Sequence, residues 1–294
     1  MSAQHVVMYH ASCADGFCAA WVMQKVFPRA DYIPCQYGQR LPCVRDSIVY
    51  IVDFSFKRQE LLHLAANNAS VVVLDHHKTA EEELGGLSGV NLECVFDLDK
   101  SGARLTLDLL ARRQLINAVD HQTVLPLVNY TEDRDLWRWR LPNSQEINAA
   151  IRSYPMTFAA WDELAVLEEA EWIAIGKAIL RYQKLEVERA IEHAYLTILD
   201  GYSITIVNAV ENISEVSQEL AKASGIGCVY FDTAEGKRVY SLRSTKTSGI
   251  DVSEIAKKYG GGGHKHAAGF SVPLGMPIKQ MELGRWKMGM GIES

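Results

Sequence analysis

The chain has 294 residues, with 30 Lys and Arg against 36 Asp and Glu, and its formal net charge is −6. The hydrophobic share of 48% is typical of soluble globular proteins and excludes a disordered, collagen-like or fibrous chain. Proteins that hold long duplex nucleic acid by bulk electrostatics are usually basic, so the acidic balance argues against that class. The length favours two domains over one large domain.

Three features of the sequence predict a cytoplasmic protein with no membrane partner. The first residues lack the basic region of a signal peptide. No apolar run reaches the ~18 residues that a membrane span needs. The six cysteines form no CxxC pair, and five of them lie in the first 94 residues. A disulfide framework would spread its bridges more evenly, so we expect reduced thiols.

Short apolar strands alternate with amphipathic helices in the first half of the chain. In chain order the predicted elements are a strand at 5–9, a helix at 16–27, a strand at 48–53, a helix at 58–66, a strand at 71–75, and helices at 102–111 and 122–130. Runs of β-branched residues that are separated by helices predict a parallel sheet of βαβ units with helices on both faces.

The second half begins with a long helical region, predicted from Trp161 to about His193. Apolar residues from Trp172 to Leu185 recur at spacings of three and four, which predicts one apolar stripe. Strands return at 203–207, 227–231 and 239–243. We therefore predict a first α/β domain at 1–195, which includes a helical linker at about 160–195, and a smaller α/β domain at 196–294.

Chemically active residues follow all three predicted strands of the first half. The carboxyl ends of parallel strands meet at one edge of a sheet, so these side chains should converge there. The residues are His10, Cys13 and Asp15 after the first strand, Asp53 at the end of the second, and Asp75, His76 and His77 at the end of the third, with Asp133 and Asp135 as a fourth group.

Several carboxylates in one place repel each other unless a cation compensates. Carboxylates mixed with imidazoles suit Mn²⁺, Fe²⁺ or Mg²⁺ better than a structural zinc site. Two ions about 3.5–4 Å apart, bridged by a carboxylate, would activate water and stabilise an in-line displacement at phosphorus. A single strand-terminal Asp is more often a cap or turn residue, and a lone His is more often structural. Three such strand ends together favour the metal site.

Four motifs in this region resemble those of the DHH phosphoesterases, a family named for an Asp-His-His triplet. They lie at residues 9–21, 53–55, 74–79 and 135–139, and the fourth resembles the motif of the nanoRNase-like branch, which degrades short oligonucleotides. The resemblance implies a DHH domain with two Mn²⁺ ions, for which Mg²⁺ or Co²⁺ are alternatives.

The resemblance also implies a role for each matching residue. His10 would ligate the first ion, Asp53 would bridge the two, and the second ion would be held by Asp15, His76 and Asp135. Asp75 would ligate or orient other ligands. His77 would lie by the scissile phosphate, where it stabilises charge or handles a proton.

Cys13 departs from the family pattern, because many members carry a carboxylate at that position. The thiol could ligate the first ion, leave that ion weakly held, or pack as an ordinary buried cysteine, and we prefer the last two readings together over direct ligation. Asp133 could compete with Asp135 as a ligand, and we prefer Asp135 because of its spacing to Trp137.

A glycine run at 260–263, followed by His264 and Lys265, is the strongest signal in the second half. Consecutive glycines expose backbone N–H groups and permit a close approach to phosphate. Predicted elements on both sides argue against a flexible linker. The segment resembles the DHHA1-type substrate-binding domain, which implies phosphate contacts from Gly262, Gly263, His264 and Arg243. On sequence alone, Arg243 could equally be a surface arginine.

Taken together, these features predict a metal-dependent phosphodiesterase that cleaves short oligonucleotides to mononucleotides by activated-hydroxide attack in a cleft between two domains. Alternative substrates are 3′-phosphoadenosine 5′-phosphate and linear or cyclic dinucleotides. A nucleotide-binding regulator with impaired catalysis is the alternative of a different class, motivated by Cys13. The expected partner is a short oligonucleotide or nucleotide, and the expected state is a monomer or homodimer.

Overall fold

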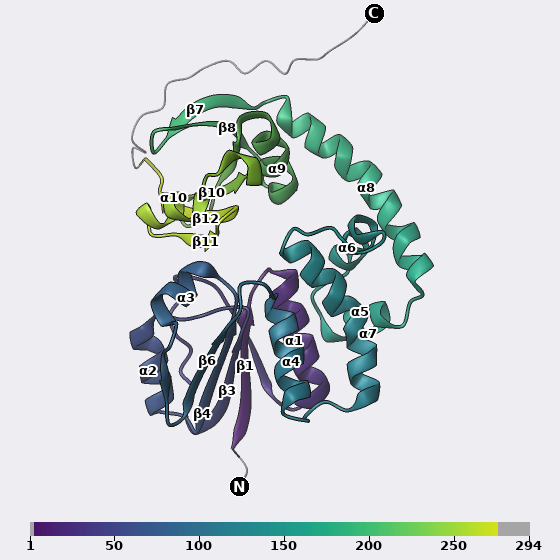
Figure 1. The fold of residues 1–294 in the computed structure, drawn as a ribbon, viewed down its shortest axis with the longest axis vertical. Coiled ribbons are helices and arrows are strands. Elements are labelled where there is room, and N and C mark those ends of the chain that lie inside the picture. The colour runs from purple at the N-terminus through teal and green to yellow at the C-terminus, as the bar shows by residue number, and fades with distance from the viewer. Residues whose placement is uncertain (1–2, 276–294) are drawn as a thin grey trace, which may run out of the picture. The chain divides into compact units, whose positions relative to one another are not determined.

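The structure is a computed structural model that describes residues 3–275 (Figure 1). The chain divides into two compact units, residues 1–180 and 181–294, which we call unit 1 and unit 2. Residues 276–294 of the second predicted domain lie outside the described part. Among the helices within residues 3–275, none is long and apolar enough to cross a membrane.

Unit 1 is built on a six-stranded sheet in the order β2-β1-β3-β4-β6-β5. All neighbouring strands are parallel except the short β5, which runs antiparallel to β6. This arrangement confirms the predicted α/β fold and its parallel sheet. The strands are β1 (Gln4–His10), β2 (Asp31–Cys35), β3 (Ser47–Val52), β4 (Ser70–Asp75), β5 (Ser88–Gly89) and β6 (Leu92–Phe96).

Helices cover both faces of this sheet, because its central strands are apolar on both faces. Val7 belongs to the core cluster that packs under α1 and α4, whereas Val6 and Met8 belong to the cluster under α2 and α3 (Figure 1). This alternation is the two-residue period of a strand. The helices of this layer are α1 (Ala14–Val26), α2 (Arg58–Ala66), α3 (Lys78–Leu84) and α4 (Gly102–Arg112).

The helical region that follows is divided into separate helices. It contains α5 (Ala118–Asp135), α6 (Ser144–Ser153), α7 (Phe158–Ala165) and α8 (Glu169–Ile191). Within the helical region predicted from Trp161 to about His193, α7 ends at Ala165 and α8 begins at Glu169. The predicted apolar stripe is also interrupted, because Trp172 is buried while Tyr182 and Leu185 are exposed. The spacing of the apolar residues does not show which part of the stripe on α8 is buried.

Unit 2 has a second six-stranded sheet, in the order β11-β12-β10-β9-β8-β7. Only β8 and β9 are parallel; the other neighbours are antiparallel. Residues of α9 pack into one apolar cluster with the sheet, and residues of α10 pack into another. The elements are β7 (Tyr195–Leu199), β8 (Tyr202–Asn208), α9 (Ile213–Ser224), β9 (Ile226–Asp232), β10 (Lys237–Ser244), α10 (Val252–Lys258), β11 (Gly262–His264) and β12 (Ala267–Pro273).

Candidate metal centre

Asp53 stands at the centre of the strand-end cluster. Strand β3 ends at Val52, so Asp53 lies just beyond the strand in which the sequence placed it. Its backbone is left-handed, with a φ of 56°, a conformation that is uncommon for residues other than glycine and that clusters at functional sites. The side chain is 1% exposed. The turn therefore directs a buried carboxylate over the edge of the sheet.

The two oxygens of Asp53 meet different histidines. Oδ1 lies 3.0 Å from Nε2 of His76, and Oδ2 lies 3.4 Å from Nδ1 of His10. Nε2 of His76 is also 3.7 Å from Oδ2 of Asp15 and 3.5 Å from Oδ2 of Asp135. The structure thus brings together, within unit 1, side chains that are separated by more than a hundred residues in the sequence.

The beginning of helix α4 holds Asp15 in place. The backbone N–H of Gly102 donates to Oδ2 of Asp15 at 2.6 Å, and that of Ala103 donates to Oδ1 at 3.1 Å. The positive end of the helix dipole favours a carboxylate at this position. A Cβ on Gly102 would lie 2.4 Å from Cβ of Asp53. Only glycine therefore allows α4 to come this close to both carboxylates.

Burial and mutual repulsion shift the pKa values of the cluster. Burial raises the pKa of Asp15 well above its usual value, and the Asp53 and Asp135 carboxylates raise it further. Burial opposes a charged His76, but the carboxylates of Asp135, Asp53 and Asp15 outweigh burial and raise the pKa of His76 to about 10. Burial also opposes ionisation of Asp53, whose pKa is nonetheless held well below its usual value by the adjacent His10 and His76 rings.

Asp75 organises the turn that carries the two histidines. Its Oδ1 accepts from the backbone N–H of His76 at 2.7 Å and lies 2.7 Å from Nδ1 of His77. Its Oδ2 accepts from Oγ of Ser55 at 2.6 Å. Burial opposes a charged His77, and Asp75 overcomes that effect and raises the pKa of His77. With both oxygens engaged in this way, Asp75 fixes the orientation of the His77 ring.

Cys13 lies beside the cluster at the start of α1. Its Sγ belongs to a group of possible ligand atoms with His10 and Asp53, all within 4.8 Å of one another. Burial raises the pKa of the Cys13 thiol well above its usual value, and the Asp53, Asp135 and Asp15 carboxylates add to the effect. Without a compensating cation, the sulfur therefore stays protonated and is a poor ligand.

Asp133 and Asp135 differ in what they contact. Both oxygens of Asp133 accept from the backbone N–H of Arg140, at 2.9 and 3.0 Å, and Oδ2 also accepts from Leu141 at 3.2 Å. These bonds close the loop that follows α5. The carboxylate of Asp135 instead reaches His76. Asp135, rather than its neighbour, is the residue that joins the cluster.

The donor set fits divalent cations. Three groups of possible ligand atoms share Asp53: His10, Cys13 and Asp53; Asp15, Asp53 and His76; and Asp53, Asp75 and His77. Within residues 3–275, Nδ1 of His10, Oδ2 of Asp53 and Oδ2 of Asp135 are buried and make no hydrogen bond. Buried polar atoms normally have partners, and carboxylate oxygens with imidazole nitrogens are ligands of Mn²⁺ and Mg²⁺.

In unit 2, two of the predicted phosphate-binding residues lie in one row of the sheet. His264 on β11 and Arg243 on β10 both pair with Ala267 on β12, one from each side. Residues directly opposite on antiparallel strands point to the same face, so their side chains flank the small Ala267. Gly263 has a φ of +136°, and a Cβ there would lie 2.5 Å from the carbonyl oxygen of Ala267.

The arginine of this row reaches the start of helix α9. Nη2 of Arg243 donates to Oγ of Ser214 at 3.0 Å, and Ser214 lies in the first turn of α9. A guanidinium, backbone N–H groups of glycines and the N-terminal end of a helix are all donors to phosphate oxygens. Unit 2 therefore presents a row of donors rather than a cluster of carboxylates.

Ser55 and Gly102 are not among the predicted site residues. Ser55 positions Asp75, and Gly102 positions Asp15 and packs against Asp53. Ser101-Gly102 before a predicted helix is an N-cap signal, and the Ser101 side chain does accept from the N–H of Arg104. The contact of Gly102 with a carboxylate 87 residues earlier in the chain is tertiary. No local pattern in the sequence carries it.

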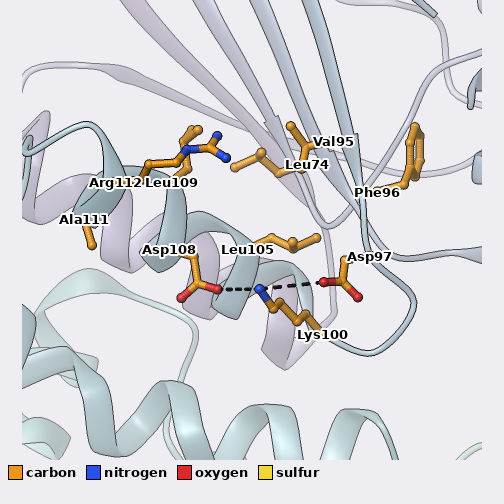
Figure 2. A pocket seen from close by; sticks show the side chains of 10 residues that line it. All are labelled: Leu74, Val95, Phe96, Asp97, Lys100, Leu105, Asp108, Leu109, Ala111 and Arg112. Atoms are coloured by element: carbon orange, nitrogen blue, oxygen red, sulfur yellow. Dashed lines mark hydrogen bonds and ion pairs between the residues drawn. The ribbon is translucent and has the colours of Figure 1, made fainter. Parts of the chain in front are cut away.

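A cavity of about 480 Å³ lies elsewhere in unit 1, between β4, β6 and α4 (Figure 2). Apolar side chains such as Leu74 and Leu105 line it, and Lys100 forms ion pairs with Asp108 at 2.9 Å and Asp97 at 3.6 Å. None of its lining residues belongs to the strand-end cluster. The cavity is therefore separate from the candidate metal centre.

Known proteins resemble this chain in sequence and in fold. It is 30% identical over 295 residues to the uncharacterized protein R106 of Acanthamoeba polyphaga mimivirus, covering 90% of this chain and 67% of that protein. The pGpG-specific phosphodiesterase PggH from Vibrio cholerae has a TM-score of 0.50 at 13% identity, with 92% of this chain and 93% of that chain covered. RecJ from Thermus thermophilus, in complex with Mn²⁺, has a TM-score of 0.50 at 18% identity, with 92% and 49% covered.

The family is shown by a match in unit 2 together with this likeness. Residues 204–282 match the DHHA1 domain, which includes the row of Arg243 and His264. In unit 1, the Asp-His-His triplet begins at the last residue of β4, where the strand pattern predicted a strand to end. The chain belongs to the DHH/DHHA1 family of phosphoesterases.

Proposed function

We propose that this protein hydrolyses short oligonucleotides to mononucleotides in a Mn²⁺-dependent reaction, as the nanoRNase-like branch of the family does. One observation carries the proposal: the buried carboxylate of Asp53 belongs to three groups of possible ligand atoms, one with His10 and another with Asp15 and His76. A shared carboxylate between two sites is the arrangement that phosphoryl-transfer enzymes with two cations require. The likeness of fold to RecJ in complex with Mn²⁺ supports the choice of metal.

The residues divide between two cation sites. His10 and Asp53 would hold the first ion, with Cys13 beside it. Asp53 would also hold the second ion, together with the three remaining ligands of the cluster, which are Asp15, His76 and Asp135. When bound, two such ions supply an activated water and Lewis-acid stabilisation of the charge that develops on the phosphoryl oxygens.

His77 is the group that would handle the proton or the charge. Asp75 holds the ring through Nδ1 at 2.7 Å, so Nε2 is the nitrogen that would face the substrate. The pKa of His77 is raised, because Asp75 outweighs the opposing effect of burial. A histidine whose pKa is raised suits charge stabilisation and proton donation to the leaving oxygen.

Unit 2 would hold a phosphate of the substrate away from the scissile bond. Arg243 would form a bidentate pair with that phosphate, and His264 would donate from the same row. Gly262 and Gly263 would add backbone N–H groups. Local contacts of this kind suit a substrate of a few nucleotides, and they agree with a chain whose net charge is −6 rather than strongly basic.

A linear dinucleotide is the second candidate substrate. The likeness of fold to PggH, a pGpG-specific phosphodiesterase, favours it. Hydrolysis of pGpG and hydrolysis of a short oligonucleotide use the same chemistry at phosphorus. The two candidates differ in the number of nucleotides that the site accepts and in the choice of base.

A substrate panel tests the proposal. The purified protein is incubated with Mn²⁺ and with labelled dinucleotides to pentanucleotides, pGpG, cyclic dinucleotides and 3′-phosphoadenosine 5′-phosphate. We expect mononucleotide release from all linear oligonucleotides, abolished by a chelator. Turnover of pGpG alone would favour the second candidate. Binding of nucleotides without turnover in Mn²⁺, Co²⁺ or Mg²⁺ would contradict the proposal and favour a regulator.

A further inference from the structure

An exposed tyrosine stands against the two histidines of unit 1 to which the proposed function gives separate roles. The ring centroid of Tyr37 lies 5.6 Å from that of His10 and 5.9 Å from that of His77, and both pairs meet edge to face. Its ring also packs against Phe54 at 4.6 Å. Tyr37 has no role in the proposed mechanism.

A tight turn presents this ring. Tyr37 follows strand β2 and lies in a turn that the N–H of Gln39 closes on the carbonyl oxygen of Gln36, at 3.2 Å. Gly38 has a φ of +81°, as the third position of a type II turn requires. The N–H of Ala11 donates to the carbonyl oxygen of Cys35 at 2.8 Å, which ties the turn to the end of β1, where His10 lies. The ring is thus presented by a constrained backbone.

Tyr37 is 53% exposed, although it is a large aromatic residue with three aromatic neighbours. Its edge contacts cover part of the ring and leave part of its surface to solvent. Ligand sites are lined by aromatic side chains next to a few polar groups, and Tyr37 stands in this way beside His10 and His77. The π face of the ring suits a ligand that is itself flat and aromatic.

We propose that Tyr37 is the platform on which the nucleobase next to the scissile phosphate stacks, and that the preference of the site for nucleotides over other phosphodiesters depends on this ring. The inference rests on the proposed function for the position of the scissile phosphate beside His10 and His77. A nucleobase is joined to that phosphate through one sugar, and Tyr37, whose ring contacts both histidines, is the exposed aromatic ring beside that position. Stacking on an aromatic ring tolerates every base, which suits a site that accepts short oligonucleotides of mixed sequence.

Three substitutions separate stacking from other roles of the tyrosine. Tyr37→Phe keeps the ring and removes the hydroxyl. Tyr37→Leu keeps apolar packing against Phe54 and removes the π face, and Tyr37→Ala removes both. Tyr182→Ala, at a tyrosine exposed on α8, is the matched control. The substrates are the dinucleotide pApA and an analogue of pApA that lacks the base next to the scissile phosphate.

We expect Tyr37→Leu and Tyr37→Ala to raise KM for pApA by about tenfold to a hundredfold, which is the usual effect of losing one stacked base. Tyr37→Phe and the control should stay close to wild type. With the abasic analogue, wild type and all variants should have similar KM values. An equal loss in Tyr37→Phe and Tyr37→Ala would overturn the inference, since it would assign the effect to the hydroxyl. A loss of kcat alone on both substrates would also overturn it.

A binding measurement keeps the inference testable apart from turnover. 2-Aminopurine nucleoside monophosphate loses fluorescence when its base stacks on an aromatic ring. We expect wild type and Tyr37→Phe to quench it, and Tyr37→Leu to bind it weakly and leave its fluorescence high. If wild type quenches the probe but turns over no substrate, the proposed function fails and the stacking role stands. Equal quenching by wild type and Tyr37→Leu would overturn the stacking role, whatever the turnover.

Discussion

The two units of the molecule place their functional side chains in opposite surroundings. In unit 1, the residues follow the ends of parallel strands, and Asp15, Asp53 and His76 are each 1% exposed. In unit 2, His264 on β11 and Arg243 on β10 are half-buried and flank Ala267 of β12 in one antiparallel row. Unit 1 buries carboxylates away from water, whereas unit 2 holds hydrogen-bond donors in a half-buried row.

This difference predicts separate roles for the two units. Burying several carboxylates together is unfavourable unless a cation compensates, so the unit 1 cluster suits an ion and the chemistry that the ion brings. A row of donors costs little to keep in water and gains when a phosphate arrives. Substitutions in unit 1 should therefore lower kcat, and substitutions in unit 2 should mainly raise KM.

The largest effect is expected at Asp53. Asp53→Asn should lower kcat by about a thousandfold or more, because the residue that both cations would share loses its charge. Asparagine tolerates the left-handed backbone at this position, so circular dichroism should show a folded protein. Asp31→Asn, at an exposed carboxylate on β2, is the control. Wild-type turnover by Asp53→Asn would show that the carboxylate bridges nothing.

Arg243 tests the other side of the comparison. Arg243→Ala should raise KM for a dinucleotide by about tenfold to a hundredfold, since a charge-assisted hydrogen bond to phosphate is lost, while kcat changes little. Arg238→Ala is the matched control on the same strand, because Arg238 is already engaged by Asp232 at 2.6 Å. A fall in kcat with an unchanged KM would place Arg243 in the chemical step and contradict the separate roles of the two units.

A smaller effect is expected at Ser55, which acts on His77 through Asp75. Ser55→Ala removes the hydroxyl that donates to Asp75 at 2.6 Å, so the support of His77 weakens. Kinetic assays should show a decrease in kcat of about tenfold, with KM nearly unchanged. Ser88→Ala, at an exposed serine of β5, should match wild type. An effect of Ser55→Ala on KM alone would mean that Asp75 does not position a catalytic group.

The smallest effect concerns pH and the metal-free protein. His76 has a pKa of about 10 and keeps its proton at neutral pH, and the pKa of Asp15 is also raised. Mn²⁺ must displace such protons, so its affinity should rise with pH by about tenfold per unit for each proton displaced. Calorimetry in buffers of different ionisation heat counts the protons released. Binding without proton release would contradict the ligand role of His76.

The same shift has a consequence for stability. The folded pKa of His76 lies above its unfolded value of about 6.5. Its contribution to the stability of the metal-free protein is therefore fully present below pH ~6.5, and it is lost as the pH rises through about 10.

Local patterns predicted the elements that depend on local chemistry. The helix at 58–66 was predicted with the bounds that α2 has, and the ends of β1, β3 and β4 were located well enough to identify His10, Asp53 and Asp75. Parallel strands then explain why these residues meet. Periodicity and strand ends are read from neighbouring residues, so the sequence carries them.

Tertiary contacts could not be predicted in the same way. The close approach of Gly102 to Asp53 depends on how α4 packs against the sheet. The engagement of Asp133 by Arg140 depends on a loop whose two tryptophans, Trp137 and Trp139, have positive φ angles. The break between α7 and α8 depends on which face each helix buries, and composition alone does not encode it.

The most direct test of the account measures metal content and turnover on the same sample. Protein stripped with a chelator is reloaded with Mn²⁺, its bound metal is counted by mass spectrometry, and release of mononucleotide from labelled pApA is followed. We expect no turnover after stripping, full recovery at two ions per chain, and fewer ions with no recovery for Asp53→Asn. Undiminished turnover by the stripped wild-type protein would contradict it.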